Sequence, residues 1–201
     1  MLPILEQIPY FNKVTLGEIL GKSGENLNYW VKKLLKGGEI VALKKGLYVS
    51  RLYLLSLEKT PILKEQYLEY LANIIRYPSY ISLEYALAKY GIIPEGVYAV
   101  TSVTTKTPRI YKNKLGNFLY KNIKSDLFNG FEVTDFEGKR IKIASRAKAL
   151  FDFFYFRKTG RLEDLRINWD QFDEKDRKEF KNVVVESGSY KINQILKVLK
   201  W

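Results

Sequence analysis

The chain has 201 residues, enough for one large domain or two small ones, and 46% of them are hydrophobic, so a core can be buried. Its 34 basic residues outnumber its 22 acidic ones, and the resulting formal charge of +12 at pH 7 favours a polyanionic partner. There is no cysteine and no histidine, which excludes disulfides, thiolate nucleophiles, Ser-His-Asp triads and zinc sites built on these residues.

The sequence has none of the patterns of a membrane protein. No apolar run approaches the ~20 residues that span a bilayer, and the N-terminal residues lack the charged and apolar regions of a signal peptide. No lysine-rich amphipathic helix lies opposite a continuous apolar face. We therefore expect a soluble, cytoplasmic protein without a membrane partner.

The first residues predict two short helices. Residues 1–12 contain an apolar segment that Pro9 ends, because proline lacks a backbone N–H and its ring does not suit a helix interior. Thr15 and Glu18 have the spacing of a capping box, in which both side chains bond the first backbone amides of a helix. We expect that helix to begin at Thr15 and to stop near residues 21–22.

A longer amphipathic helix follows. Ser23 is a suitable N-cap, and Gly37-Gly38 ends the helix, because a residue without Cβ enters the left-handed conformation at little cost. Strands at 39–43 and 47–50, joined by a Lys44-Lys45-Gly46 turn, come next. The apolar residues of the helix recur with the helical period: Leu27, Trp30, Val31, Leu34 and Leu35. Residues 15–50 therefore predict a winged helix-turn-helix.

The exposed face of this helix has side chains that suit DNA. No acid follows Glu25 on that face, although glutamate forms helices as well as lysine does. An asparagine amide pairs bidentately with adenine, and lysine reaches guanine acceptors or phosphates. We predict major-groove contacts from Asn26, Asn28, Tyr29 and Lys33, phosphate contacts from Lys32 and Lys36, and wing contacts to the backbone or minor groove from Lys44 and Lys45. The alternative is a protein-docking module with solvated lysines.

The segment Glu58-Lys59-Thr60-Pro61 indicates a boundary, so the predicted domains are 1–60 and 61–201. The second domain is predicted to be α+β with a helical tail. It has four or five expected strands, among them a hairpin of 131–136 and 140–143 that turns at Glu137-Gly138. Its expected helices cover 63–76, the residues after Ser82, 146–156 with Ser145 as cap, 174–186 and 190–201.

Two stretches of the second domain are basic without an intervening acid. Tyr111, Phe118 and Tyr120 alternate with the first stretch, as aromatic residues do in some single-strand nucleic-acid sites. The alternative is a half-buried strand with one basic and one aromatic face. The proposed surface for nucleic acid or an acidic partner comprises Lys106, Arg109, Lys112, Lys114, Lys121 and Lys124 in the first stretch, and Lys139, Arg140, Lys142, Arg146 and Lys148 in the second.

Three motifs occur in order along the second domain. Residues 80–87 (YISLEYAL) and 90–94 (YGIIP) are followed by a strand at 97–101, and residues 144–152 (ASRAKALFD) form a helix start. They resemble the "YISLESAL…HGL…P" segment and the "AsPErALlDll" helix of the AbiEi antitoxins, transcriptional regulators of type IV toxin–antitoxin systems. With the winged helix, the resemblance covers about residues 5–156. Tyr90 stands where a histidine is common, and Arg146-Ala147 replaces a Pro-Glu pair.

The resemblance implies a repressor that binds repeats in its own promoter through residues 15–50. It also implies an adjacent nucleotidyltransferase-like toxin, which the second domain counteracts without a stable complex between the two proteins. We expect no enzymatic activity, no cofactor and no metal. The two basic stretches are the candidates for neutralising the toxin, and Asp152 is expected to be structural and not catalytic, for instance by bonding a neighbouring backbone amide.

Two other functions remain open from the sequence. One is an ordinary winged-helix regulator without a toxin, whose second domain dimerises or senses a ligand. The other is a Mg²⁺-dependent nuclease, because Asp126 or Asp135 followed by Glu137-Gly138-Lys139 has the order of a D…E-x-K site, where carboxylates hold the metal and lysine orients water. The expected hairpin turn at Glu137-Gly138 disfavours the nuclease, since such a site needs these residues along a strand.

Overall fold

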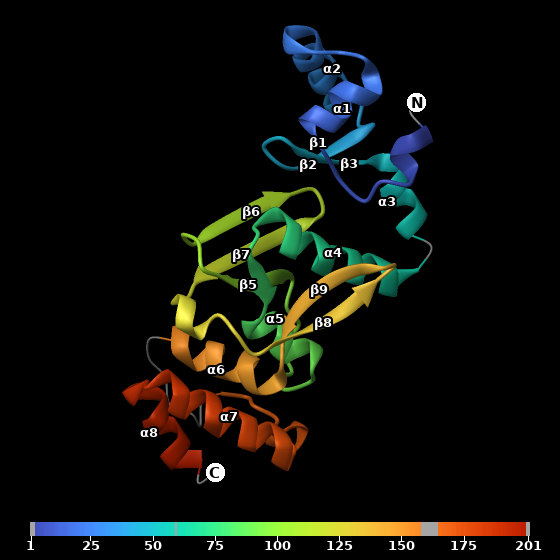
Figure 1. Ribbon diagram of the computed structural model, residues 1–201. Coiled ribbons are helices and arrows are strands. Elements are labelled where there is room, and N and C mark those ends of the chain that lie inside the picture. The colour runs from blue at the N-terminus through green and yellow to red at the C-terminus, as the bar shows by residue number, and fades with distance from the viewer. Residues whose placement is uncertain (1–2, 59, 158–164, 200–201) are drawn as a thin grey trace. The chain divides into compact units, whose positions relative to one another are not determined.

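The computed structural model describes residues 3–58, 60–157 and 165–199, and its fold is mixed α+β (Figure 1). The chain divides into two compact units, of which the first comprises residues 1–68 together with 111–116, and the second 69–110 and 117–201. Helix α4 (Pro61–Ile75) begins at the predicted domain boundary, and its part up to Leu68 groups with the first unit. Lys59, in the predicted boundary segment, lies outside the described residues.

The first unit combines short helices with a three-stranded antiparallel sheet in the order β1-β3-β2. Phe11 pairs with Tyr48 across β1 and β3, and Ile40 pairs with Ser50 across β2 and β3. The hairpin predicted over 39–50 is confirmed. Along the chain the elements are η1 (Pro3–Glu6), β1 (Phe11–Asn12), α1 (Lys13–Leu20), α2 (Gly24–Lys36), β2 (Ile40–Lys44), β3 (Leu47–Ser50) and α3 (Arg51–Leu57).

Two predictions for the first residues are wrong. The helix expected over 1–12 is a short 3-10 helix followed by strand β1. Helix α1 begins at Lys13 and not at Thr15, because Asn12 leaves β1 with an extended backbone and caps the helix, its Oδ1 accepting a hydrogen bond from the Thr15 amide at 2.9 Å. The sequence contains two overlapping cap patterns, and the pairing of β1 with β3 selects the earlier one.

Helix α2 is held by the apolar stripe that its spacing predicts. Leu27, Val31 and Leu34 are buried in the core of the first unit. Helix α1 approaches the start of α2 closely at Gly17, where a Cβ would lie 2.9 Å from Leu27 Cδ2 and 2.9 Å from the Lys22 carbonyl oxygen. The missing side chain therefore fixes the separation of the two helices.

The second unit contains most of a six-stranded mixed sheet in the order β6-β7-β5-β4-β9-β8, where the sequence predicted four or five strands. The predicted hairpin is confirmed, since Phe131 pairs with Ala144 and Phe136 with Lys139 on either side of the Glu137-Gly138 turn. The strands are β4 (Ser79–Ile81), β5 (Ala99–Thr104), β6 (Arg109–Asn113), β7 (Gly116–Asn122), β8 (Phe131–Phe136) and β9 (Lys139–Ala144). The helices after α4 are α5 (Leu83–Lys89), η2 (Ser125–Leu127), α6 (Arg146–Phe156), η4 (Trp169–Gln171), α7 (Glu174–Ser187) and α8 (Tyr190–Leu199).

Helices α4 and α6 cover opposite faces of this sheet. Ser79 Oγ donates to the Ala72 carbonyl of α4 at 3.4 Å, and the next residue, Tyr80, donates its hydroxyl to Asp152 Oδ2 of α6 at 2.9 Å. Successive side chains leave a strand on opposite faces. Tyr120 of β7 also donates to the Ala72 carbonyl, at 2.6 Å, which places its side chain on the α4 side.

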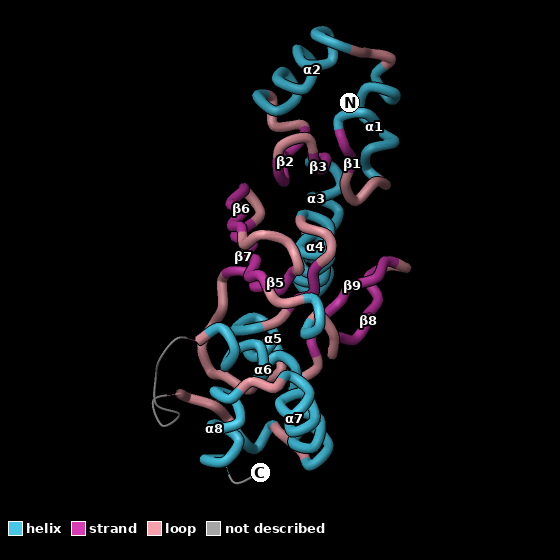
Figure 2. The backbone as a smooth tube through the Cα atoms, turned by 60° about the vertical axis from the view of Figure 1, so that its left-hand side comes forward, coloured by secondary structure: helices cyan, strands magenta, loops and turns pink. Residues whose placement is uncertain are grey.

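The helical tail extends the α6 side. Helices α5 and α6 pack together, and α7 packs on α6 with the rings of Phe154 and Phe180 6.3 Å apart (Figure 2). Ser145 caps α6 as predicted, because its Oγ accepts a hydrogen bond from the Lys148 amide at 3.1 Å. Residues 200–201 of the predicted last helix lie outside the described part. Among the described helices, none is long and apolar enough to cross a membrane.

Candidate nucleic-acid interface

The outer face of α2 exposes all of the residues for which DNA contacts were predicted on this helix. With about 100° of rotation per residue, they share the arc opposite the buried Leu27, Val31 and Leu34. The exposed residues are Asn26, Asn28, Tyr29, Lys32, Lys33 and Lys36. Glu25 is exposed on the same arc and is the only acidic residue of α2. Three lysines and two amides therefore lie together on one solvent-facing surface.

Asn28 has a partner that sequence reasoning missed. Lys13 Nζ donates to Asn28 Oδ1 at 2.5 Å, from a half-buried lysine to an exposed asparagine. The amide oxygen of Asn28 is thereby engaged, while its NH₂ group still has donors to offer. The sequence clue to this contact is that Lys13 follows Asn12, which caps α1 and makes Lys13 the first residue of the helix. The prediction that the helix begins at Thr15 left Lys13 outside it.

Aromatic rings position Lys33. Its ammonium lies 4.5 Å from the centroid of the Trp30 ring, within the range of a cation–π contact. The ring of Tyr29 meets that of Trp30 edge-on at 6.2 Å, and 61% of the Tyr29 surface is exposed. Trp30 therefore has two roles, since it is half-buried on the helix and supports a lysine at the surface.

The predicted wing residues differ in exposure. Lys45 is exposed at the turn of the β2–β3 hairpin, and Lys44, the last residue of β2, is half-buried. Gly46 completes the turn with a φ of +79°, a conformation that glycine adopts without strain. Lysine side chains at this turn extend from the same unit as the outer face of α2.

The first basic stretch of the second predicted domain is divided between the two units. Lys112 and Lys114 are exposed and lie in 111–116, which groups with the first unit. Lys121 is half-buried, with its ammonium 5.4 Å from the Phe156 ring centroid. The remaining residues of the stretch are exposed in the second unit: Lys106, Arg109 and Lys124.

The residues of the second basic stretch differ in exposure. Arg140 is exposed, whereas three other members are half-buried beside their own partners. Lys139 Nζ lies 3.6 Å from a Glu137 carboxylate oxygen, and the Lys142 ammonium lies 5.0 Å from the Phe131 ring centroid. Arg146 pairs with Asp176 of α7 at 3.5 Å. Strand β9 and the start of α6 use these side chains for internal contacts.

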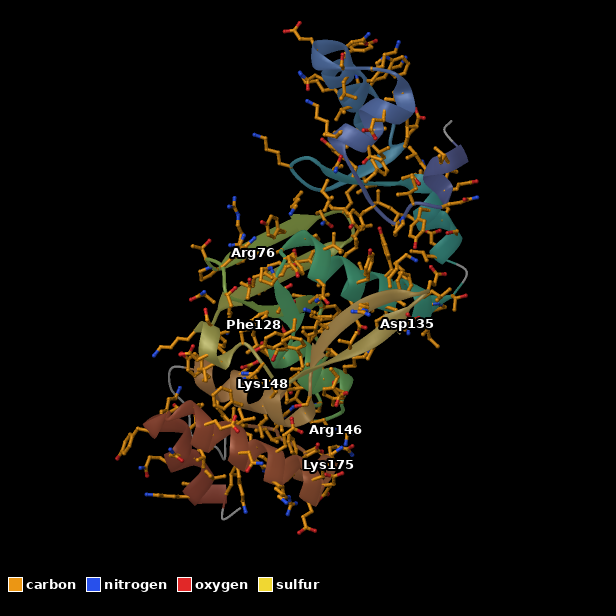
Figure 3. The ribbon with its side chains drawn as sticks, in the orientation of Figure 1. Arg76, Phe128, Asp135, Arg146, Lys148 and Lys175 are labelled. Atoms are coloured by element: carbon orange, nitrogen blue, oxygen red, sulfur yellow. The ribbon has the colours of Figure 1, made fainter. Side chains whose placement is uncertain are left out.

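The prediction that Lys148 lies on a basic surface is wrong, because its side chain is fully buried. Lys148 is in the first turn of α6 (Figure 3). Its ammonium lies 2.8 Å from Asp152 Oδ1, one helical turn away, and donates to the Leu127 carbonyl at 2.8 Å. Helix α6 is apolar on several sides, so a lysine in its first turn points into the protein and not to solvent. Lys148 therefore belongs to the core and not to a basic surface.

Asp152 contacts side chains from three elements. Its carboxylate accepts hydrogen bonds from the Tyr80 hydroxyl at 2.9 Å and Ser82 Oγ at 2.8 Å, besides the pairing with Lys148. These partners are side chains, and not the backbone amide that was one example of a structural role. Burial raises the pKa of Asp152, with Lys148 as the main opposing influence, and burial lowers the pKa of Lys148, opposed by Asp152. The network links β4, the start of α5 and α6.

The residues of the alternative nuclease site form a hairpin turn. The Gly138 amide donates to Asp135 Oδ1 at 3.1 Å, and Lys139 Nζ donates to the Glu137 carbonyl at 3.1 Å. Glu137 is exposed and has a φ of +50°. In the described part of the chain, no group of three or more acidic residues is placed to hold a metal ion. Asp135, Glu137 and Lys139 therefore make hydrogen bonds within the β8–β9 turn.

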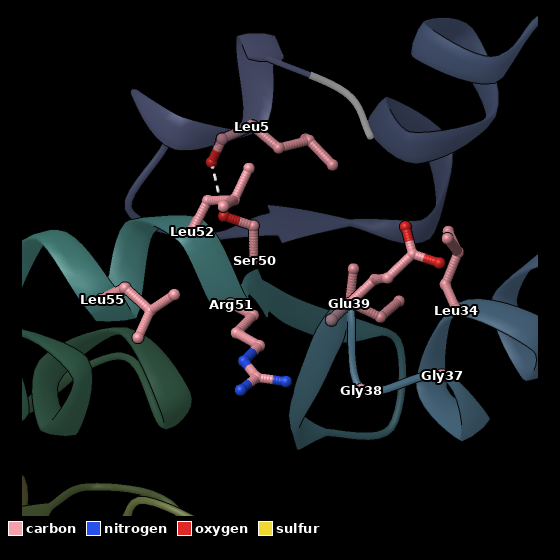
Figure 4. A pocket seen from close by; sticks show the side chains of 10 residues that line it. Leu5, Leu34, Gly37, Gly38, Glu39, Ser50, Arg51, Leu52 and Leu55 are labelled. Carbon is pink, nitrogen blue, oxygen red and sulfur yellow. Dashed lines mark hydrogen bonds between the residues drawn. The ribbon is translucent and has the colours of Figure 1, made fainter.

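A mainly apolar cavity of about 350 Å³ lies in the first unit, beside the end of α2 (Figure 4). Leu5, Leu34 and Leu55 line it, together with Glu39 and Arg51. Its size is at the lower end of the range of small-molecule pockets. Leu34 lies on the buried side of α2, so a molecule in this cavity would leave the exposed arc accessible.

No protein-family model and no curated protein matches this chain.

Proposed function

We propose that the protein is a DNA-binding regulator, whose first unit is a winged helix-turn-helix with α2 as the recognition helix and the β2–β3 hairpin as the wing. The main support is the outer arc of α2, where two amides, three lysines and a tyrosine are exposed opposite a buried stripe. The element order β1, α1, α2, β2, β3 and the exposed Lys45 at the hairpin turn agree with this function.

In this proposal the first turns of α2 lie in the major groove, where side chains reach base edges. Asn26 pairs with adenine through both groups of its amide. Asn28 has its Oδ1 bonded to Lys13, so its NH₂ donors are the more accessible part of the amide, which suits the N7 and O6 acceptors of guanine. Lys32, Lys36 and the wing lysines contact phosphates. The adenine preference expected for every amide thus applies to Asn26 and not to Asn28.

The resemblance to AbiEi antitoxins supports a more specific proposal. The protein would bind repeats in its own promoter and repress its operon, and its second unit would counteract a nucleotidyltransferase-like toxin without a stable complex. A regulator without a toxin has the same first unit. The adjacent gene distinguishes these two functions, because only the antitoxin is encoded beside a nucleotidyltransferase-like reading frame.

Binding of the purified protein to its own upstream DNA and to the same bases in scrambled order tests the regulator. Both duplexes are measured at one near-physiological salt concentration, because a chain with a charge of +12 binds any DNA when salt is low. We expect a preference of about 10³-fold or more for the upstream DNA. Equal affinity for the two duplexes would show that the lysines supply charge alone, and the autorepressor would be rejected.

A further inference from the structure

The side chain of Asn113 attaches the turn between β6 and β7 to the proposed wing. Asn113 Nδ2 donates to the Leu43 carbonyl at 3.0 Å. The other end of the same amide, Oδ1, accepts from the backbone amides of Leu115 at 2.8 Å and Gly116 at 3.3 Å. Asparagine has both the acceptor and the donors that these contacts require. Asn113 therefore shapes its own turn and holds it against the residue that precedes Lys44.

Both turns belong to the first unit, which includes residues 111–116. Lys112 and Lys114 flank Asn113 and are exposed, as Lys45 is, while Lys44 is half-buried. The sequence contains no acidic residue from 40 to 57 or from 106 to 124. Four lysines from two distant segments of the chain are thus gathered at two neighbouring turns, and both segments are basic in the sequence.

We propose that residues 111–116 are a second basic turn of the DNA-binding surface, in which Lys112 and Lys114 contact the phosphates of duplex DNA together with Lys44 and Lys45. This inference rests on the proposed DNA-binding function and adds to its interface. Lysine is a point charge on a long stem, which suits phosphates and not the reading of bases. We call the four lysines and their two turns the composite wing.

The composite wing separates Lys112 and Lys114 from the rest of the basic stretch at 106–124. Lys106, Lys121 and Lys124 lie in the second unit, and the Lys121 ammonium is next to the Phe156 ring. The continuous run in the sequence therefore contains lysines with two different roles. Only the pair beside Asn113 is expected to contribute to DNA affinity.

The salt dependence of DNA binding tests the composite wing. Each phosphate contact adds about 0.9 to the slope of log K against log salt concentration, because a counterion is released. The full-length protein is titrated with a short duplex of random sequence over a series of salt concentrations. The variants are Lys112→Gln/Lys114→Gln and the control Lys106→Gln/Lys124→Gln, which loses the same two charges from exposed positions of the second unit.

We expect the Lys112/Lys114 variant to lose between about 1 and 2 units of slope, and the control pair to keep the wild-type slope. Equal slopes for the two variants would overturn the composite wing. Two equally reduced slopes would show an effect of net charge alone, and two wild-type slopes would show that Lys112 and Lys114 contact no phosphate. The random duplex makes this comparison independent of the operator. A protein that fails to prefer its upstream DNA but shows the slope difference would retain the composite wing and lose the proposed autorepressor function.

Discussion

At the scale of single residues, the hydrogen bond between Lys13 and Asn28 sets which groups Asn28 would offer to a base in the proposed DNA complex. In Lys13→Ala the Asn28 oxygen is released, and the whole amide can then pair with adenine. We expect the preferred base at the Asn28 position to change from guanine towards adenine, by an amount within the about 1–3 kcal/mol of a good bidentate pair. Binding to upstream duplexes that differ at one base pair measures the change.

A matched control for this prediction is Lys36→Ala, which removes an exposed lysine from the same surface. Its proposed contact is a phosphate, so the variant is expected to weaken binding to all duplexes by the same factor. If Lys13→Ala also weakened every duplex equally, Lys13 would be a phosphate contact and the Asn28 assignment would be wrong.

Lys148 gives a stability prediction at the same scale. In Lys148→Met the Asp152 carboxylate stays buried without its cation, and we expect a loss of about 3–5 kcal/mol in the free energy of unfolding near neutral pH. Burial already raises the pKa of Asp152, and losing Lys148 removes the main opposing influence. The folded variant therefore holds the Asp152 proton more tightly than the unfolded chain does, so its stability falls as pH rises through the folded pKa.

Urea unfolding at pH 5 and pH 8 measures this effect, and the deficit of Lys148→Met relative to wild type should be larger at pH 8. The double variant Lys148→Met/Asp152→Asn is the control, because it removes both charges of this pair and keeps an acceptor oxygen for Tyr80 and Ser82. It should recover part of the loss and show no such pH difference. A deficit below about 1 kcal/mol in the single variant would contradict the importance of the pair.

At the scale of the elements, the contact between α1 and α2 depends on Gly17. Alanine would improve helix propensity by about 1 kcal/mol, but its Cβ would lie 2.9 Å from a backbone carbonyl oxygen, which must move. Overpacking of this kind costs about 1–3 kcal/mol. The two effects together lead us to expect that Gly17→Ala lowers the free energy of unfolding by up to about 2 kcal/mol, measured by urea unfolding.

Gly37→Ala is the control for this prediction. Gly37 has a φ of −73°, which alanine adopts freely, and its Cβ would come no closer than 3.4 Å to another atom. This variant should stay within about 0.5 kcal/mol of wild type. If Gly17→Ala were the more stable of the two, helix propensity would outweigh the close approach of α1 and α2.

The elements that could be predicted from the sequence are those whose conformation depends on residues close to them in the chain. The outer arc of α2 follows from the period of its apolar residues, and the β8–β9 hairpin from alternation around Glu137-Gly138. The start of α1 could not be predicted in this way. Asn12 and Thr15 both fit a cap, and the choice depends on the pairing of β1 with a strand more than thirty residues later.

The basic stretches were harder to interpret, because charge in a sequence does not reveal which way a side chain points. Lys148 lies on a helix with apolar residues on almost every side and has Asp152 four residues later, so its burial was open to prediction. The attachment of Lys112 and Lys114 to the first unit could not be predicted from the sequence. It depends on the hydrogen bond between Asn113 and Leu43, which are seventy positions apart.

At the scale of the whole molecule, the first unit is assembled from two separate segments of the chain, 1–68 and 111–116. Engineers often move DNA-binding modules between regulators by exchanging one continuous piece of sequence. A chimaera made in that way from this protein would leave Lys112, Asn113 and Lys114 behind, together with the donor for the Leu43 carbonyl. If the composite wing binds DNA as proposed, moving the first unit by itself requires a second, six-residue graft, because a single crossover after residue 68 leaves residues 111–116 behind.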